Sequence, residues 1–176
     1  MGLLPASQFD GKAGPHYRNP SDHVLRIDFV TCAARRRGPV VMPELNLVLQ
    51  PLKFMEFSLE NVQQAVLFCA EGAVLVNVPH PARYALHKLL IFGERTGTFS
   101  IKGSKDLTQA ADILACLKPH RASEVEEAWL DLVSRGPSWI MRARQGLKAL
   151  DATHPDLAVQ EWLRLPARVR NATRLR

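Results

Sequence analysis

The chain has 176 residues, of which 47% are hydrophobic and 23% are charged, and its formal net charge at pH 7 is +6. This composition is ordinary for a soluble globular protein and argues against a fibrous or low-complexity chain. No apolar run is long enough to cross a bilayer, and the N-terminus lacks the basic and apolar regions of a secretory signal. We therefore expect a cytoplasmic protein that has no contact with a membrane.

The first half of the sequence predicts β-strands. Residues 23–31 alternate with a period of two, which is typical of a half-buried strand, and residues 45–52 form a second aliphatic segment. Residues 65–78 contain two apolar runs around Ala70-Glu71-Gly72, and a short loop that ends in glycine favours a hairpin. A helix over residues 58–69, beginning at a capping serine, is the competing interpretation.

The second half of the sequence predicts helices. Pro81 suits the first turn of a helix, and Ser104 is placed to cap the next one. Ser123 with Glu126 three residues later has the pattern of a capping box. We expect five helices, over residues 81–93, 105–117, 124–134, 138–150 and 156–163. Strands followed by helices predict an α+β fold.

We expect a β/α core over residues 9–118, a helical annex over residues 122–165 and a basic tail over residues 166–176. The positive charge lies almost entirely at the C-terminal end, since residues 137–176 carry 8 basic and 3 acidic side chains, whereas residues 1–136 carry 15 and 14. Such an excess can attract RNA or a nucleotide. The alternative is a solvated, arginine-rich tail.

Two cations, one on the first predicted helix and one just past its end, are candidates for phosphate binding. Lys88 lies off the apolar stripe of that helix, and Arg95 follows it by seven residues, or two turns. One face would then offer an ammonium and a guanidinium group to a phosphate chain. The alternative is that both are ordinary surface cations. Lys105 and Asp106 open the next predicted helix, where the helix dipole favours an acid.

Metal chemistry has one candidate ligand and little support from spacing. Asp28 is a carboxylate between apolar neighbours on a predicted strand, which is either a metal ligand or an outward-facing polar residue. His80 and His87 have no accompanying Cys-x-x-Cys or His-x-x-x-His pattern, so we expect no zinc site. The three cysteines are far apart in apolar settings, which predicts reduced, buried thiols.

Four segments, in this order along the chain, resemble one protein family. They are "LRIDFVT", "QPLKFMEF", "VLVNVPHPARYALHKLLIFGER" and "KDLTQAADIL", and the similarity covers about residues 9–135. The chain resembles bacterial proteins with a nucleotidyltransferase-like domain, a wider group that includes the abortive-infection type IV toxin nucleotidyltransferases. The resemblance implies an α+β fold in which a truncated nucleotidyltransferase-like mixed sheet is followed by a C-terminal helical bundle.

The resemblance also implies roles for five residues. Asp28 would match the third metal carboxylate and bind Mg²⁺, and Lys88 and Arg95 would match the basic pair near the nucleotide phosphates. Lys105 and Asp106 would match the Lys-Asp pair that completes the site. The implied catalytic residues are therefore Asp28, Lys88 and Asp106, and the implied nucleotide-binding residues are Lys88, Arg95 and Lys105. The substrate would be an NTP, and the acceptor RNA or a protein.

One part of the family pattern is missing. Members of the family carry a Gly-Ser and then an Asp-x-Asp ahead of the third acid. Here only 27 residues precede Asp28, and they contain Asp10 and Asp22 but no Asp-x-Asp; the only Gly-Ser is Gly103-Ser104, downstream. Nucleotidyl transfer relies on paired metal ions that this acidic pair would hold.

We therefore expect that the complete family transfers NMP from an NTP, whereas this chain is shortened and inactive by itself. The missing front of the sheet would expose an edge, which favours a homodimer. The alternative is a non-catalytic interaction protein, or an NTP- or nucleic-acid-binding protein, that uses its basic helical C-terminus.

Overall fold

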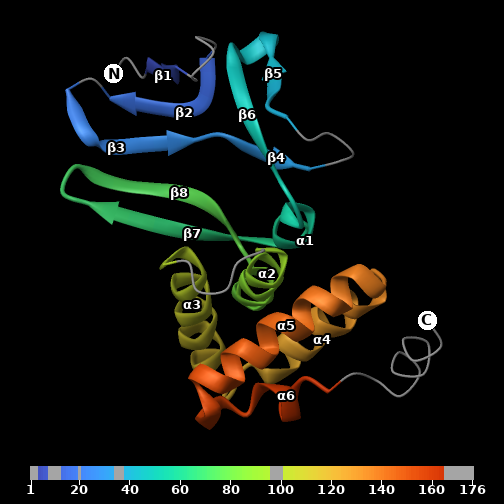
Figure 1. The fold of residues 1–176 in the computed structure, drawn as a ribbon. Helices are drawn as coiled ribbons and strands as arrows, with labels where there is room; N and C mark the ends of the chain where they lie inside the picture. The colour runs from blue at the N-terminus through green and yellow to red at the C-terminus, as the bar shows by residue number, and fades with distance from the viewer. Residues whose placement is uncertain (1–3, 8–12, 20, 34–37, 96–100, 165–176) are drawn as a thin grey trace. The chain divides into compact units, whose positions relative to one another are not determined.

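The computed structural model describes residues 4–7, 13–19, 21–33, 38–95 and 101–164. The chain forms two compact units, Met1–Glu56 and Phe57–Arg176, which we call the first and second unit (Figure 1). The described part of the first unit is built mainly from strands, and that of the second from a hairpin followed by helices. The predicted α+β class is thus confirmed.

The described residues of the first unit form two three-stranded sheets. The strands β1 (Leu4–Ser7), β2 (Ala13–Asn19) and β3 (Asp22–Asp28) are antiparallel in the order β1-β2-β3. The second sheet is mixed and has the order β4-β6-β5, with β4 (Val30–Cys32) parallel and β5 (Val40–Met42) antiparallel to β6 (Leu47–Leu52). A 3-10 turn, η1 (Pro43–Leu45), connects β5 to β6.

The single strand predicted over residues 23–31 is divided between these two sheets. The division falls at Phe29, because its carbonyl accepts a hydrogen bond from the Gln50 amide at 2.8 Å and the chain there leaves β2 for β6 as its partner. Tyr17 packs its ring edge-on against Phe29, with ring centroids 5.0 Å apart. Its buried hydroxyl accepts a hydrogen bond from the Val48 amide, which ties β2 to β6.

The second unit begins in the short helix α1 (Met55–Leu59), which crosses the unit boundary, and continues into the predicted hairpin. Its strands are β7 (Val62–Cys69) and β8 (Gly72–Pro79). Cys69 pairs with Gly72, so the loop has two residues, and Gly72 has a φ of +146°, which favours glycine. The hairpin is confirmed, and the competing helix over residues 58–69 is wrong.

Six further elements lie in the described part of the second unit, and all five predicted helical regions are present there. They are α2 (Pro81–Glu94), α3 (Ile101–Leu117), α4 (Ala122–Ser134), α5 (Pro137–Thr153), the 3-10 turn η2 (Pro155–Leu157) and α6 (Val159–Trp162). Their core consists of Trp129 on α4 together with small and aliphatic side chains, including Ala85, Leu86, Leu89, Leu90, Ala110, Leu114, Val125, Leu132 and Leu150. The helices predicted as an annex, α4 and α5, belong to the same unit as α2 and α3. No helix in the described ranges is both long and apolar enough to cross a membrane.

The predicted helix ends are less accurate than the helices themselves. Helix α3 already includes Ser104, and α4 already includes Ser123, so neither serine is the N-cap. The cap of α4 is Arg121, whose side chain makes no capping hydrogen bond. The helix predicted over residues 156–163 is divided at Ala158, whose φ is +45°. The cysteines were expected to be buried, but all three are exposed.

Candidate functional site

Helices α2 and α3 bring three of the predicted site residues together. Nζ of Lys88 lies 3.2 Å from Oδ1 of Asp106, and Nη2 of Arg95 lies 2.9 Å from its Oδ2. The Asp106 side chain is only 8% exposed, whereas the Lys88 side chain is 18% and that of Arg95 33% exposed. The three side chains form a cluster, here called the Asp106 cluster, in which two cations share one carboxylate and the formal charge is +1.

The sequence of α2 explains where its two cations lie. Leu86, Leu89 and Leu90 are fully buried, so the stripe predicted from the helical period faces the core. Lys88 lies at the margin of this stripe, and its ammonium lies 5.0 Å from the ring centroid of Tyr84, one turn earlier. Arg95 is the C-cap residue of α2, and its amide donates a hydrogen bond to the Phe92 carbonyl.

The sequence suggested that Asp106 lies at the start of its helix, but the structure places it further along. Helix α3 begins at Ile101, so Asp106 lies in its second turn, where the helix dipole no longer explains a buried acid. The explanation is its pairing with Lys88 and Arg95, because a buried carboxylate requires partners. Its neighbour Lys105 is exposed, and the contacts described for the cluster do not include it.

Asp28 lies in the first unit, and its carboxylate contacts a cation and a histidine. Its Oδ1 lies 2.8 Å from Nε of Arg26 and 2.7 Å from Nδ1 of His16, and its Oδ2 accepts a hydrogen bond from Arg26 at 3.0 Å. The hydrogen bond from Arg26, followed by that from His16, lowers the pKa of Asp28. All three side chains are about two-fifths exposed, so this is a surface ion pair on β2 and β3.

The residues that the structure describes do not fit a magnesium site. A Mg²⁺ ion takes oxygen ligands, usually carboxylates together with water and substrate phosphates. Asp28 is the predicted metal ligand, but both of its oxygens face Arg26 or His16. Among the described residues no group of three or more His, Cys, Asp or Glu side chains is placed to hold a metal ion. The metal role of Asp28 itself is not tested by these contacts and stays a prediction.

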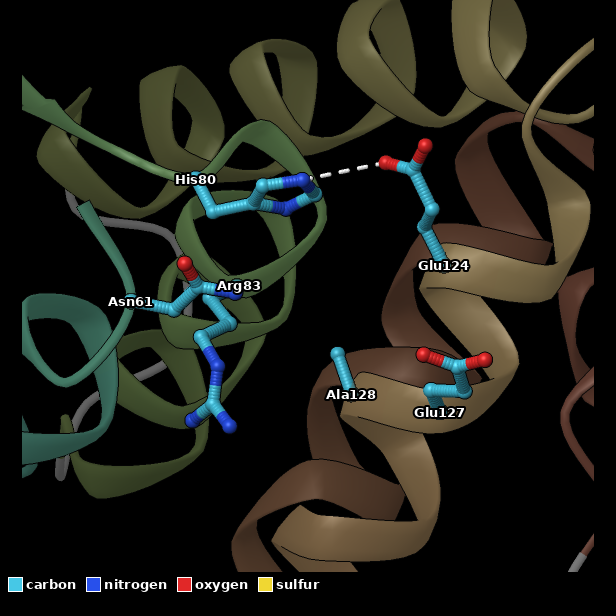
Figure 2. A pocket seen from close by; sticks show the side chains of 6 residues that line it. All are labelled: Asn61, His80, Arg83, Glu124, Glu127 and Ala128. Atoms are coloured by element: carbon cyan, nitrogen blue, oxygen red, sulfur yellow. Dashed lines mark ion pairs between the residues drawn. The ribbon is translucent and has the colours of Figure 1, made fainter. Parts of the chain in front are cut away.

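Sequence reasoning missed a small polar pocket in the second unit, which has a volume of about 160 Å³ and is drawn in Figure 2. Glu124 lies on α4 and contacts two basic side chains. Its Oε2 lies 3.0 Å from Nε2 of His80, and its Oε1 accepts a hydrogen bond from Arg121 at 2.7 Å. Arg121 and His80 lower the pKa of Glu124. The pocket is lined by Asn61, His80, Arg83, Glu124, Glu127 and Ala128.

A network of ion pairs lies beside this pocket and joins α1, α2 and α4. Arg83 contacts Asp131 at 2.7 Å and the Phe57 carbonyl at 3.2 Å, and its guanidinium lies 4.8 Å from the Phe57 ring centroid. Arg135 pairs with both Asp131 and Glu60. The partners lie up to 75 residues apart, so no local pattern in the sequence indicates the network.

The network changes the ionisation of its members. The hydrogen bonds that Arg135 donates to Glu60 lower the pKa of Glu60 and raise that of Arg135. Burial alone would raise the pKa of Asp131, but its hydrogen bonds from Arg135 and Arg83 outweigh burial and lower it. Since every charged member has an opposite charge beside it, we assign the network to the stability of the second unit.

Similarities to known proteins come from a protein-family model and from a solved structure. The model of a nucleotidyltransferase family matches residues 3–134. A similar solved structure is that of an antigenic nucleotidyltransferase-like protein from Paracoccidioides brasiliensis, with 15% sequence identity and a TM-score of 0.41. The alignment covers 92% of this chain and 60% of the other, so this chain spans about three-fifths of the length of that protein. No curated protein matches the sequence.

Proposed function

Because this chain belongs to the nucleotidyltransferase family, we propose that its second unit binds the phosphates of a nucleoside triphosphate through Lys88 and Arg95. The observation that carries the proposal is the Asp106 cluster, in which both cations are directed at one point by a shared carboxylate. Arginine offers five N–H donors and lysine three, so one contact each with Asp106 leaves donors for phosphate oxygens. The formal charge of +1 favours an anionic ligand.

The chemistry of the family is the transfer of a nucleotidyl group, and its members in general use a divalent metal and an NTP. The described residues do not supply a fitting metal site, and the sequence contains no Asp-x-Asp. For this chain by itself we therefore propose nucleotide binding without NMP transfer. Transfer to an RNA or protein acceptor would require carboxylates beyond those that the described residues bring together.

The proposal is tested by the effect of ATP on thermal stability. A ligand at about 100 times its dissociation constant stabilises the folded state by about 2.7 kcal/mol, which raises the melting temperature of a chain of this size by roughly 5–10 °C. We expect such a rise for the wild type, and a much smaller one for Lys88→Ala and Arg95→Ala. Arg144→Ala is the matched control, because Arg144 is an exposed cation on α5 of the same unit.

Two results would contradict the proposal. One is a wild-type protein whose melting temperature does not respond to ATP. The other is a response that Lys88→Ala and Arg95→Ala retain in full. Incubation with labelled NTP and Mg²⁺ tests the proposed absence of NMP transfer. We expect that the chain by itself incorporates no labelled nucleotide.

The charge distribution supports a second candidate, a non-catalytic role in binding RNA. Residues 137–176 carry 8 basic and 3 acidic side chains, and Arg144, Lys148 and Arg164 are exposed among the described residues. Binding of this kind falls steeply as salt is added, because it releases counterions. RNA binding that ATP does not displace, and that Lys88→Ala leaves unchanged, would favour this candidate over phosphate binding at the Asp106 cluster.

A further inference from the structure

We propose that Asp106 competes with the phosphates of the nucleotide for Lys88 and Arg95, and so lowers the affinity of the site. This inference rests on the proposed function, since it concerns the same two cations. The carboxylate is 8% exposed and contacts each cation with a different oxygen, at 3.2 Å and 2.9 Å. An incoming phosphate therefore meets two cations that already have an anionic partner.

The two cations differ in how readily a phosphate reaches them. Arg95 is 33% exposed and ends α2, and one of its terminal nitrogens makes the contact with Asp106. The other N–H groups of its guanidinium are available to a phosphate. Lys88 is 18% exposed, and its ammonium contacts the Asp106 carboxylate and lies 5.0 Å from the ring centroid of Tyr84. We therefore infer that a phosphate first contacts Arg95, and that it engages Lys88 at the expense of the Lys88–Asp106 ion pair.

Two opposing effects decide whether the Asp106 carboxylate strengthens or weakens the binding of ATP. The carboxylate orders both cations, and losing this order weakens binding by about tenfold if both rotamer-rich side chains must be immobilised again. The carboxylate also repels a phosphate a few ångströms away, and removing one unit charge at that distance in a partly exposed site strengthens binding by about thirtyfold to a hundredfold. Repulsion is the larger effect, so the net expectation is tighter binding without the charge.

The test is calorimetric titration with ATP in the presence of EDTA, so that the nucleotide is the only ligand. Asp106→Asn keeps the size of the side chain and removes its charge. We expect it to lower the dissociation constant for ATP by about threefold to tenfold. Asp106→Glu keeps the charge and should bind ATP within about twofold of the wild type.

Asp112→Asn is the matched control for net charge. Asp112 is an exposed carboxylate on α3, six residues from Asp106, and outside the contacts of the cluster. Its substitution removes the same charge from the same helix, so it should change the dissociation constant by less than about twofold. Equal tightening by Asp112→Asn would overturn the inference, because it would show an effect of net charge only.

Weaker or unchanged binding by Asp106→Asn would also overturn the inference and identify Asp106 as a positioning residue. If neither the wild type nor Asp106→Asn binds ATP, the proposed function itself fails. If Asp106→Asn does not fold, the ¹³C signal of the Asp106 carboxyl in the wild type supplies the test. We expect ATP to shift this signal as the ion pairs with Lys88 and Arg95 are exchanged for phosphate contacts, and an unchanged signal in saturated protein would overturn the inference.

Discussion

Nζ of Lys88 lies 3.2 Å from Oδ1 of Asp106, although 18 residues separate them and they belong to different helices. This ion pair joins α2 to α3 at a position where the carboxylate is almost buried. Lys88 therefore contributes to the stability of the second unit, and a test of its proposed role in phosphate binding has to distinguish the two effects. Arg95 contacts the same carboxylate from the end of α2 and is more exposed.

We predict that Lys88→Ala destabilises the protein more than Arg95→Ala does. Lys88→Ala removes a partly buried cation, its contact with the Tyr84 ring and one of the two partners of Asp106. We expect a loss of about 2–3 kcal/mol, because a buried carboxylate loses part of its compensation. Arg95→Ala should cost about 1 kcal/mol or less, since the Arg95 side chain is 33% exposed and solvent screens its contact with Asp106.

Chemical denaturation followed by tryptophan fluorescence checks this prediction. Trp129, Trp139 and Trp162 are the only tryptophans of the chain, and all three lie in the second unit, so the signal reports on that unit. Equal losses for the two variants would show that Arg95, despite its exposure, supports Asp106 as much as Lys88 does.

A second prediction concerns the contact between α2 and α5, which depends on two glycines. A Cβ atom on Gly146 would lie 2.8 Å from Cα of Leu89, and one on Gly93 would lie 2.8 Å from Cα of Arg142. Alanine favours a helix by about 1 kcal/mol over glycine, but here it would force the two backbones apart. We expect Gly146→Ala and Gly93→Ala each to lower the free energy of unfolding by about 1–3 kcal/mol.

The control for the glycine prediction is Gly38→Ala. Nothing lies within 4 Å of a Cβ at Gly38, so its substitution should change the stability by less than about 0.5 kcal/mol. Thermal unfolding measures all three variants. A Gly146→Ala protein as stable as the wild type would mean that α2 and α5 adjust their separation at little cost.

The third prediction concerns acid stability and follows from Glu60 and Asp131. Both pKa values are lowered in the folded protein, in Glu60 chiefly by Arg135, and in Asp131 by Arg135 and Arg83 against the effect of burial. The unfolded chain then binds more protons than the folded one as the pH falls below the ordinary values of 4.5 and 3.8. The stabilisation is thus complete above about pH 5 and is lost as the pH falls through the lowered pKa values.

Denaturation at pH values between about 2 and 6 measures this effect. In the double variant Glu60→Gln/Asp131→Asn, the acid-induced loss of stability should be smaller by about 1 kcal/mol, a value that allows for solvent screening at the half-exposed Glu60. Glu127→Gln, which alters an exposed carboxylate on α4, should leave the acid-induced loss of stability as it is in the wild type. A double variant with the same acid profile as the wild type would assign the acid sensitivity to other groups.

The sequence predicted best where the signal is local. The pattern over residues 65–78 predicted the hairpin, and helical periodicity with Pro81 predicted α2, since both depend on neighbouring side chains. Strands β1 and β2 were not predicted, because "LPAS" and "AGPHYRN" show no alternation of apolar and polar side chains. Helix starts at Ser104 and Ser123 were wrong because a suitable capping residue does not prevent a helix from starting earlier.

The sequence by itself determined the α+β class and the helix that carries Lys88, and the family resemblance grouped Lys88, Arg95 and Asp106 with Asp28 and Lys105. Only the tertiary structure decided that Asp106 lies between the two cations, because the azimuth of α3 against α2 depends on how their buried faces pack. The same holds for the ion pairs of Arg135, whose partner Glu60 is 75 residues away. Periodicity places a side chain on one face of its own helix, but the group opposite that face is set by long-range packing.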